Sequence, residues 1–334
     1  MFRPILCNYY VTTRCNARCG FCDIHLREGS DAVLADVVAN LKLLERTGVR
    51  FVDFTGGEPL LHPDLPVMLR EARKLGLRTI MTTNGLLYPK RAGEIAGLVS
   101  LLRISLDSVR KAVHDALRGV PAFDRVMESL DVSRSLGERP DLIFTVTAKN
   151  AGQILEAAEF ARRNRLMLLL NPASSGFGNP GPDRKVLDAV LAAASLPYVT
   201  VNRGVVRFMQ RGGNRTRHPR CRAVTSTVVI SPDNTILVPC YHQAVMQIPA
   251  ETHLKGWSRR SEYRMFRKCE GRFRVCEGCT ISCNFDPSFT VGWDEYFFLS
   301  QISKVKYIWD KFVRTGFTPG RKVAKKAYTN EIDS

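Results

Sequence analysis

Three cysteines near the start of the chain have the spacing of metal-cluster ligands. Cys15, Cys19 and Cys22 are separated by three and two residues and follow an apolar run at residues 4–12. A cube of four irons and four sulfurs usually takes four cysteines, so a site with three leaves one iron open to another ligand. The alternative is zinc, but structural zinc sites close all four positions with a nearby second pair, and the next cysteine is Cys221. The spacing therefore favours an iron-sulfur cluster with chemistry at its open iron.

Three further motifs each close a strand-like apolar run and combine polar residues with turn-forming ones. They are Thr-Gly-Gly-Glu-Pro at residues 55–59, Thr-Thr-Asn-Gly at residues 82–85 and Ile-Ser-Leu-Asp at residues 104–107. Glycine suits positions where the backbone must approach a ligand closely, although Asn-Gly and Ser-Leu-Asp also occur in ordinary turns. Each motif is weak by itself, but four motifs in this order, counting the cysteines, form a specific pattern.

This pattern resembles the radical S-adenosylmethionine (SAM) enzymes, over about 100 residues of the chain. The resemblance implies that the three cysteines hold a [4Fe-4S] cluster whose open iron chelates the methionine moiety of SAM. One electron from a donor such as flavodoxin or ferredoxin then cleaves SAM reductively to a 5′-deoxyadenosyl radical, which abstracts hydrogen from an unactivated carbon of the substrate. The resemblance thus predicts an iron-sulfur oxidoreductase or transferase whose cofactor carries the difficult step.

The resemblance also implies a set of SAM-contacting residues at the ends of the strands. Backbone at the Gly-Gly-Glu motif meets the SAM amino group, and the aromatic residue before the third cysteine shields the cluster. A His-Asp…Arg-Gly pattern at residues 114–119 places polar groups near SAM, although its arginine also suits a helix end, where the dipole favours a cation. No catalytic side chain is assigned. The implied cofactor-binding residues are Phe21, Gly56, Gly57, Glu58, Asn84, Ser105, Asp107 and Arg118.

A second group of cysteines lies between residues 221 and 283. It resembles the SPASM and Twitch extensions of radical SAM enzymes, which hold auxiliary clusters, although the usual glycine before the second cysteine is absent and the series is short. We therefore expect one auxiliary iron-sulfur cluster. Its implied ligands are Cys221, Cys240, Cys276 and Cys279, with Cys283 competing for a place and Cys269 less favoured.

A zinc site is the alternative for the second cysteine group, and Cys7 belongs to neither group. A zinc ribbon would need two Cys-x2-Cys pairs, whereas the second group contains one such pair, at Cys276 and Cys279. Cys7 stands alone inside the first apolar run, and we expect it to be a small buried core residue because free cysteine is among the most buried residue types.

Periodicity predicts an α/β fold. Short apolar runs at residues 4–12, 50–54, 77–82, 100–106, 141–147 and 166–170 alternate with helix-like stretches at residues 32–45, 65–75, 123–136 and 153–164. This pattern implies a parallel sheet with right-handed crossovers, in either a barrel or a doubly wound form. Neither a dinucleotide fingerprint nor a phosphate-loop lysine motif accompanies the strands. The resemblance selects a partial (β/α)6 parallel barrel with a smaller C-terminal cysteine-rich auxiliary domain.

The expected domains are the radical SAM partial barrel at residues 1–202, the auxiliary cluster domain at 203–294, and a basic amphipathic helix and tail at 295–334.

The chain carries 49 Lys and Arg against 32 Asp and Glu, a formal charge of +17. Seven arginines and no acidic residue lie between residues 203 and 222. Some can neutralise a cluster, but the surplus indicates an anionic partner.

Residues 295–314 predict a basic amphipathic helix, with Phe298, Ile302, Val305, Trp309 and Phe312 at helical spacing. Such a helix can lie in a membrane interface, but more often its apolar stripe packs on the protein's own core, and we expect the latter. No signal peptide and no apolar run of about 20 residues is present. The expected location is the cytoplasm, with peripheral contact to the inner face of the membrane as the further option.

The substrate is not written in the sequence. The auxiliary cysteines and the His-Asp…Arg-Gly pattern favour maturation of a ribosomal peptide, although no N-terminal domain precedes the barrel to grip a leader. The basic tail favours modification of a lipid or isoprenoid at the membrane, so an anionic or membrane-associated substrate is expected. The alternative is a non-catalytic iron-sulfur or zinc protein that binds nucleic acid through its basic half. The intact first cysteine motif and Gly-Gly-Glu-Pro argue against that alternative.

Overall fold

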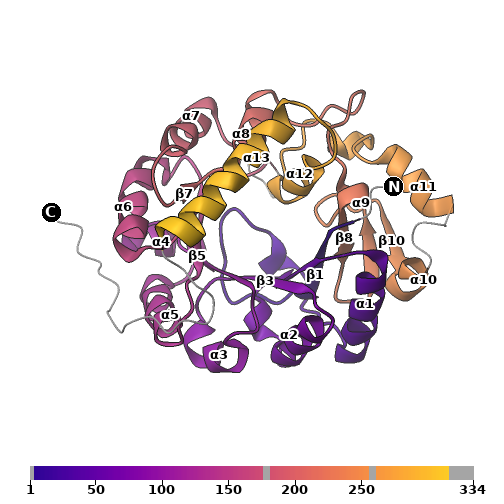
Figure 1. Cartoon of the computed structure of the whole chain (residues 1–334), viewed down its shortest axis with the longest axis horizontal. Helices are drawn as coiled ribbons and strands as arrows, with labels where there is room; N and C mark the ends of the chain where they lie inside the picture. The colour runs from indigo at the N-terminus through magenta and orange to yellow at the C-terminus, as the bar shows by residue number, and fades with distance from the viewer. Residues whose placement is uncertain (1–3, 176–180, 256–260, 316–334) are drawn as a thin grey trace.

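The computed structural model of the chain describes residues 4–175, 181–255 and 261–315. Its centre is a parallel sheet that curves into an open barrel, with helices outside (Figure 1). The strands that follow one another along this sheet are β1 (Leu6–Thr12), β2 (Phe51–Gly56), β3 (Arg78–Thr83), β4 (Leu101–Ser105), β5 (Asp141–Val146), β6 (Leu168–Pro172) and β7 (Val199–Thr200). The predicted α/β partial barrel is confirmed, and its sheet remains open.

Helices connect successive strands and cover the outer face of the sheet (Figure 1). They are α1 (Leu34–Thr47), α2 (Leu65–Lys74), α3 (Tyr88–Ile95), α4 (Lys111–Arg118), α5 (Phe123–Ser135), α6 (Ile154–Asn164) and α7 (Arg184–Ala193). The four helices predicted from periodicity are confirmed to within two residues at each end. The sequence analysis missed α3 and α4, each of eight residues, and α7, of ten.

Alternate strand residues face the helices and the barrel interior, as the two-residue period of a strand requires. On β1, Cys7, Tyr9 and Val11 belong to the large core shared with the outer helices, whereas Tyr10 belongs to a separate inner cluster. Cys7 is fully buried, as predicted. The predicted motifs follow the C-terminal ends of β1 to β4, which is the edge where parallel barrels bind ligands.

The cysteine-rich region continues the barrel sheet. Strand β8 (Thr227–Ile230) pairs in parallel with β1, and β9 (Thr235–Val238) and β10 (Met246–Pro249) extend the sheet in antiparallel fashion. The surrounding helices are α9 (Ala223–Ser226), α10 (Ala250–Leu254), α11 (Ser261–Cys269) and α12 (Ser282–Ser288). The predicted boundary at residues 202 and 203 therefore falls inside a region where both parts share one sheet.

Helix α13 (Glu295–Ile308) and a π-helical turn (Trp309–Arg314) close the described part of the chain. Helix α13 packs against α8 (Arg203–Gln210) and β7, and Lys306 Nζ donates to the carbonyls of Leu196 and Val199 at 2.9 and 2.7 Å. Because these carbonyls precede or begin β7, the helix covers the N-terminal end of the barrel. Figure 1 shows it running across the barrel from α12.

The expectation that the apolar stripe of this helix packs on the core is wrong. Phe298, Ile302, Val305, Trp309 and Phe312 are 53, 57, 67, 57 and 43% exposed. The opposite face is buried instead, because it carries small and polar side chains that bond to the barrel, among them Ser300, Ser303, Asp310 and Lys311. None of the described helices combines the length and hydropathy required to cross a bilayer.

Candidate active site

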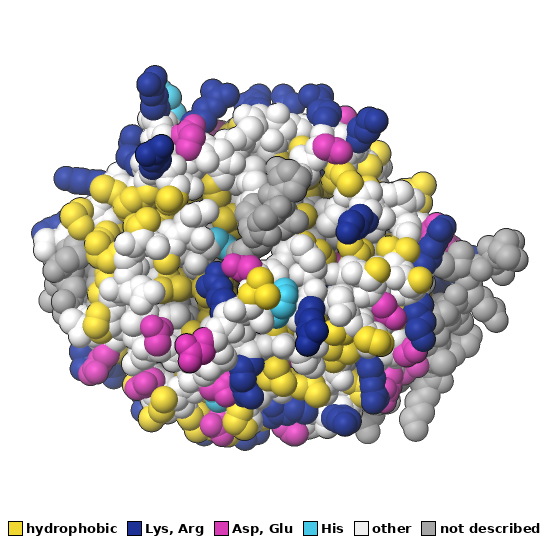
Figure 2. All heavy atoms as spheres, turned by 180° about the vertical axis from the view of Figure 1, so that it is seen from behind, with side chains coloured by type: hydrophobic (Ala, Val, Ile, Leu, Met, Phe, Trp, Pro, Cys, Tyr) yellow, Lys and Arg dark blue, Asp and Glu magenta, His cyan; other side chains and the backbone are white. Residues whose placement is uncertain are grey.

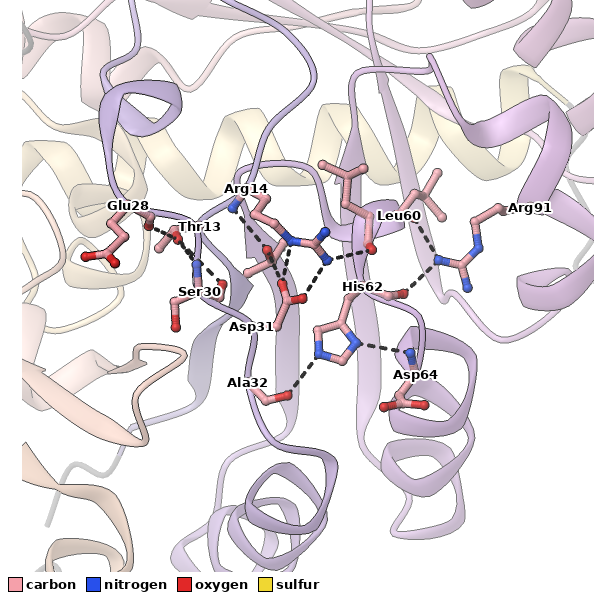
Figure 3. Close-up of polar contacts among 12 residues, drawn as sticks. Thr13, Arg14, Glu28, Ser30, Asp31, Ala32, Leu60, His62, Asp64 and Arg91 are labelled. Atoms are coloured by element: carbon pink, nitrogen blue, oxygen red, sulfur yellow. Dashed lines mark hydrogen bonds and ion pairs between the residues drawn. The ribbon is translucent and has the colours of Figure 1, made fainter.

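The loop that carries Cys15, Cys19 and Cys22 is fastened at its base by polar contacts (Figure 3). Arg14 donates to both carboxylate oxygens of Asp31, at 3.0 and 2.5 Å, and to the Leu61 carbonyl at 3.1 Å. Arg14 therefore joins the loop after β1 to the turn after β2. The backbone entering the cysteine loop has a defined course before any cofactor is present.

The two glycines of the Gly-Gly-Glu motif let the β2 end cross this loop. An ideal Cβ on Gly56 would lie 2.1 Å from the Thr12 carbonyl oxygen, and one on Gly57 would lie 2.0 Å from the Arg14 carbonyl oxygen. Gly56 also has a φ of 150°. Glu58 N donates to the Arg14 carbonyl at 2.8 Å. The glycines are thus required by the close backbone crossing itself, and this crossing places the motif beside the cysteines.

Glu58 is buried and holds the ends of two strands together. Its Oε1 accepts from the Thr83 hydroxyl at 2.8 Å and from Leu60 N at 3.1 Å, and its Oε2 accepts from Asn84 N at 2.7 Å. Burial raises the pKa of Glu58 to about 7, although these hydrogen bonds favour the ionised form. The carboxylate therefore points into the protein, so any contact with a ligand here falls to the motif's backbone.

Two donors predicted from separate motifs reach the first thiols. Asn84 Nδ2 lies 4.0 Å from Cys15 Sγ and donates to Asn16 Oδ1 at 2.8 Å. Arg118 Nη1 lies 3.7 Å from Cys19 Sγ. A thiolate-ligated cluster carries negative charge, and donors aimed at sulfur stabilise it. The donor set around this loop therefore fits the group that the sequence predicts.

Arg118 is the centre of this site. Its Nη2 pairs with Asp107 Oδ2 at 2.7 Å, both side chains being buried, and its Cζ lies 5.6 Å from the centroid of the Phe21 ring. Asp107 Oδ1 also accepts from Thr145 N at 2.8 Å. Burial raises the pKa of Asp107, and Arg118 opposes this rise. The guanidinium points inward to a carboxylate, so it does not serve as a solvent-facing cation at the helix end.

The glycine after Arg118 has a structural reason of its own. Gly119 has a φ of 68°, and a Cβ there would lie 2.3 Å from the Arg18 carbonyl oxygen. In the opposite direction, Arg18 N donates to the Arg118 carbonyl at 2.9 Å. The end of α4 therefore touches the cysteine loop directly, which explains the Arg-Gly pair in the sequence.

His114 contacts the backbone of the same aspartate. The backbone N–H of Asp107 donates to His114 Nδ1 at 3.1 Å, so the ring proton is on Nε2. Burial, helped by Arg118, lowers the pKa of His114 to about 3 and keeps the ring neutral. Ser105, the last predicted residue of this site, is buried at the C-terminal end of β4, and no side-chain hydrogen bond joins it to another described residue.

The second group of cysteines lines a cavity. The cavity is small and is bordered by four thiols, together with Asn214, Asn284, Phe285 and other side chains; the thiols belong to Cys221, Cys240, Cys276 and Cys279. These are the four ligands that the sequence favours. Asn214 ties the walls together, since its Nδ2 donates to the carbonyls of Gly271 and Cys276 at 2.8 and 3.1 Å.

The distances between these thiols help to decide between a zinc ion and an iron-sulfur cluster. In the described part of the chain, no three His, Cys, Asp or Glu side chains lie close enough to share one metal ion. A zinc site needs four ligands within about 2.3 Å of one point, whereas cubane ligands each bind a different iron. Cys269 is not among the residues that line the cavity. Cys283 is solvent-exposed, within electrostatic reach of Cys240 and Asp53, and also outside the lining.

An aromatic stack joins the two cysteine regions. The rings of Tyr10 on β1 and Tyr241, next to Cys240, are parallel to within 5°, with centroids 3.7 Å apart. Arg27, which follows the first cysteine loop in the sequence, has its Cζ 4.5 Å from the centroid of the Tyr241 ring. The sequence analysis missed these three residues. Their only signal is aromatic and basic type near cysteines, which is too common to identify a contact.

Two charged side chains in the middle of strands were also missed. Asp53 on β2 and Arg103 on β4 occupy positions that alternate with core residues, and Asp53 Oδ1 and Arg103 Nε are buried without a hydrogen-bond partner among the described residues. Burial raises the pKa of Asp53, and Arg103 opposes the rise. The sequence did contain a signal for them, because each is a single charged residue inside an apolar strand. A buried charge normally needs a partner, so such a residue points to a partner or a ligand.

Comparison with known proteins identifies the first part of the chain. Residues 9–161 match the family model described as the radical SAM superfamily. A protein named probable GTP 3′,8-cyclase from Sulfolobus acidocaldarius is 33% identical over 178 residues, which are 50% of this chain and 56% of that protein. Its namesake from Saccharolobus islandicus is 32% identical over 176 residues, 50% of this chain and 57% of that protein. The match thus spans little more than half the length of these relatives.

Solved structures share the fold over more of the chain. SuiB of Streptococcus suis, bound to SAM, has a TM-score of 0.64 at 21% identity and covers 79% of this chain and 68% of its own. The protein anSMEcpe with bound SAM has a TM-score of 0.64 at 17% identity and covers 93% of this chain and 98% of its own. These likenesses extend past the barrel into the cysteine-rich region.

Proposed function

We propose that the chain, whose residues 9–161 match the radical SAM superfamily model, is an enzyme of that superfamily in which Cys15, Cys19 and Cys22 hold a [4Fe-4S] cluster that binds SAM. When bound, the cluster and SAM supply a 5′-deoxyadenosyl radical that abstracts hydrogen from an unactivated carbon of the substrate. The protein's contribution is to bind and orient these groups and to exclude water.

The contacts of Arg118 carry this proposal. One guanidinium contacts Cys19 and Phe21 of the cysteine motif and Asp107 of the motif at residues 104–107. In this role Arg118 neutralises thiolate charge and holds Asp107 ionised at the C-terminal edge of the barrel. Asn84 performs the matching task at Cys15, and Glu58 keeps the ends of β2 and β3 together. Phe21 covers the cluster loop, and Ser105 with the Gly56–Gly57 backbone completes the proposed SAM-contacting set.

We further propose one auxiliary cluster in the cavity bordered by Cys221, Cys240, Cys276 and Cys279. The four thiols that border one cavity support it, and Cys283 is the replacement ligand if one of the four is lost. The Tyr10 and Tyr241 stack places this cavity next to the barrel interior, where a substrate and both clusters would lie close together.

For the substrate we propose a molecule that presents a polar group to Asp53 and Arg103 inside the barrel. A peptide and a lipid or isoprenoid head group both meet this requirement. The relatives named GTP 3′,8-cyclase make a purine nucleotide the second candidate. Against it, Arg211, Arg220 and Arg222 of the arginine-rich segment are paired with Glu295, Asp294 and Glu270. Figure 2 shows, on the face seen from behind, basic side chains both along the rim and nearer the middle, with acidic ones among them.

The proposal is tested by SAM cleavage. Anaerobically reconstituted protein, reduced with dithionite, should form 5′-deoxyadenosine, and the variant with Cys15, Cys19 and Cys22 all changed to alanine should form none. Cys269→Ala is the matched control and should retain the activity. If the triple variant still cleaves SAM, the assignment of the first cluster is wrong. Stimulation of 5′-deoxyadenosine formation by added GTP would favour the nucleotide over the peptide or lipid.

A further inference from the structure

The outward face of α13 and of the π-helical turn is apolar along its whole length. Large apolar side chains between 43 and 82% exposed lie there and, for Trp293, just before α13. We call them the apolar ridge: Trp293, Phe298, Ile302, Val305, Ile308, Trp309, Phe312 and Val313. Glu295 and Arg314 are the charged residues exposed beside them. Exposed apolar side chains are usually scattered singly, whereas a contiguous run marks an interaction site.

Polar contacts on the opposite face prevent the helix from rolling to bury this ridge. Ser300 Oγ donates to Asn202 Oδ1 at 2.9 Å, and Arg203 N donates to Ser303 Oγ at 3.1 Å. Farther along, the Tyr307 hydroxyl donates to Asp141 Oδ2 at 2.7 Å. A rotation that buried the ridge would break these bonds, so its exposure belongs to the folded structure.

The shape of the ridge suits a flat apolar partner. Phe298 and Phe312 are 14 positions apart, which corresponds to about 21 Å along a helix. Trp293 and Trp309 lie toward the two ends, and tryptophan is enriched where an apolar medium meets water. Helices with one apolar face of this kind lie in the plane of a bilayer interface.

The charge next to the ridge selects the partner. Helix α8 packs closely on α13, since a Cβ on Gly204 would lie 2.5 Å from Ser300 Oγ. Its arginines at 203 and 207 are four residues apart and so share one face of α8. The whole chain has a net charge of +17. A second copy would be repelled by that charge, whereas anionic lipid head groups would be attracted.

We propose that the apolar ridge docks the protein on an anionic membrane surface, with the arginines of α8 adding electrostatic attraction. The inference concerns location and is independent of the substrate proposed above. It replaces the expectation that this stripe packs on the protein's own core.

Co-sedimentation of the full chain with vesicles tests the inference. The protein should sediment with vesicles of phosphatidylcholine and phosphatidylglycerol, bind pure phosphatidylcholine more weakly, and be released by salt. Changing Ile302 and Val305 together to serine should lower binding by about tenfold or more, because each loses an apolar contact with lipid. Leu155→Ser on α6, where Leu155 is 68% exposed, is the matched control and should bind like the wild type.

Three results would overturn the proposal. They are wild-type protein that remains in the supernatant with every vesicle, a double variant that sediments as well as the wild type, and a wild-type dimer that the double variant converts to a monomer. The last result would assign the ridge to a second copy. Equal melting temperatures of wild type and variants by circular dichroism would show that a loss of binding comes from the surface and not from unfolding.

Discussion

The two cysteine regions are built differently. At the first loop, charged and amide donors from other elements reach the thiols of Cys15 and Cys19, and Cys15 and Cys22 are only partly buried. In the second region, Cys221, Cys240 and Cys276 are buried around a small cavity that apolar side chains help to line. We infer that the first site is organised to admit a ligand, and the second to enclose a resident group.

The largest expected effect is a loss of iron from the second region that leaves SAM cleavage at the first region intact. Changing Cys276 and Cys279 to alanine should remove about half of the iron, from about eight to about four per chain, because one cubane is lost. Formation of 5′-deoxyadenosine without substrate should persist, since the first loop is untouched. Iron analysis and the cleavage assay on one preparation test this. Loss of all iron, or no loss, would show that the two regions do not hold separate clusters.

Removing the charge of Arg118 should break the polar organisation of the first site. Arg118→Gln leaves Asp107 buried without its cation, which should lower the free energy of unfolding by about 3 to 5 kcal/mol. The additional change Asp107→Asn should recover a large part of this loss. Urea denaturation of the apo-protein measures both variants.

Arg110→Gln is the control for this pair. Arg110 precedes the same helix and its ion pair with Glu156 is exposed, with 60% of the Arg110 side chain accessible, so its loss should leave the unfolding free energy nearly unchanged. Equal effects of the two arginine substitutions would contradict the central role of Arg118.

Glu58 should make the first region sensitive to pH. Its pKa is raised from 4.5 to about 7 in the folded protein, so the folded state binds its proton more tightly than the unfolded state. The stability from this group is therefore present below about pH 4.5 and declines as pH rises through 7, by up to about 3 kcal/mol. Urea denaturation at pH 5 and pH 8 should show a smaller advantage of wild type over Glu58→Gln at the higher pH. An advantage that is constant with pH would refute this.

The smallest expected effect is on stability, from a change to Asp53 in the barrel interior. Asp53→Asn should raise the free energy of unfolding at pH 8 by about 1 kcal/mol, because Asp53 Oδ1 is buried without a hydrogen-bond partner among the described residues. The substitution removes the charge and keeps the shape of the side chain. Thermal melting of the apo-protein detects this. A destabilised variant would mean that Asp53 has a structural partner and is not reserved for a ligand.

Local patterns in the sequence were enough for much of the fold, and a local pattern also predicts the first three cysteines as cluster ligands. The spacing of Cys15, Cys19 and Cys22 is a property of one short loop, and strand and helix periods depend on neighbouring residues. The four favoured cysteines of the second group also border one cavity, although Cys221 and Cys279 are 58 positions apart in the sequence. For these features, residue type and spacing already contain the physical constraint.

Contacts between distant segments were decided only by the tertiary structure. Arg118 reaches Cys19 across 99 positions of the chain. That Asp53 Oδ1 and Arg103 Nε are buried without a hydrogen-bond partner among the described residues is known only from their surroundings. The stripe on α13 shows the limit most clearly. Its spacing predicted an amphipathic helix, but which face meets the barrel depended on whether the barrel offers apolar surface or backbone carbonyls. It offers the carbonyls of Leu196, Val199 and Arg139, so the polar face is buried and the apolar face meets solvent.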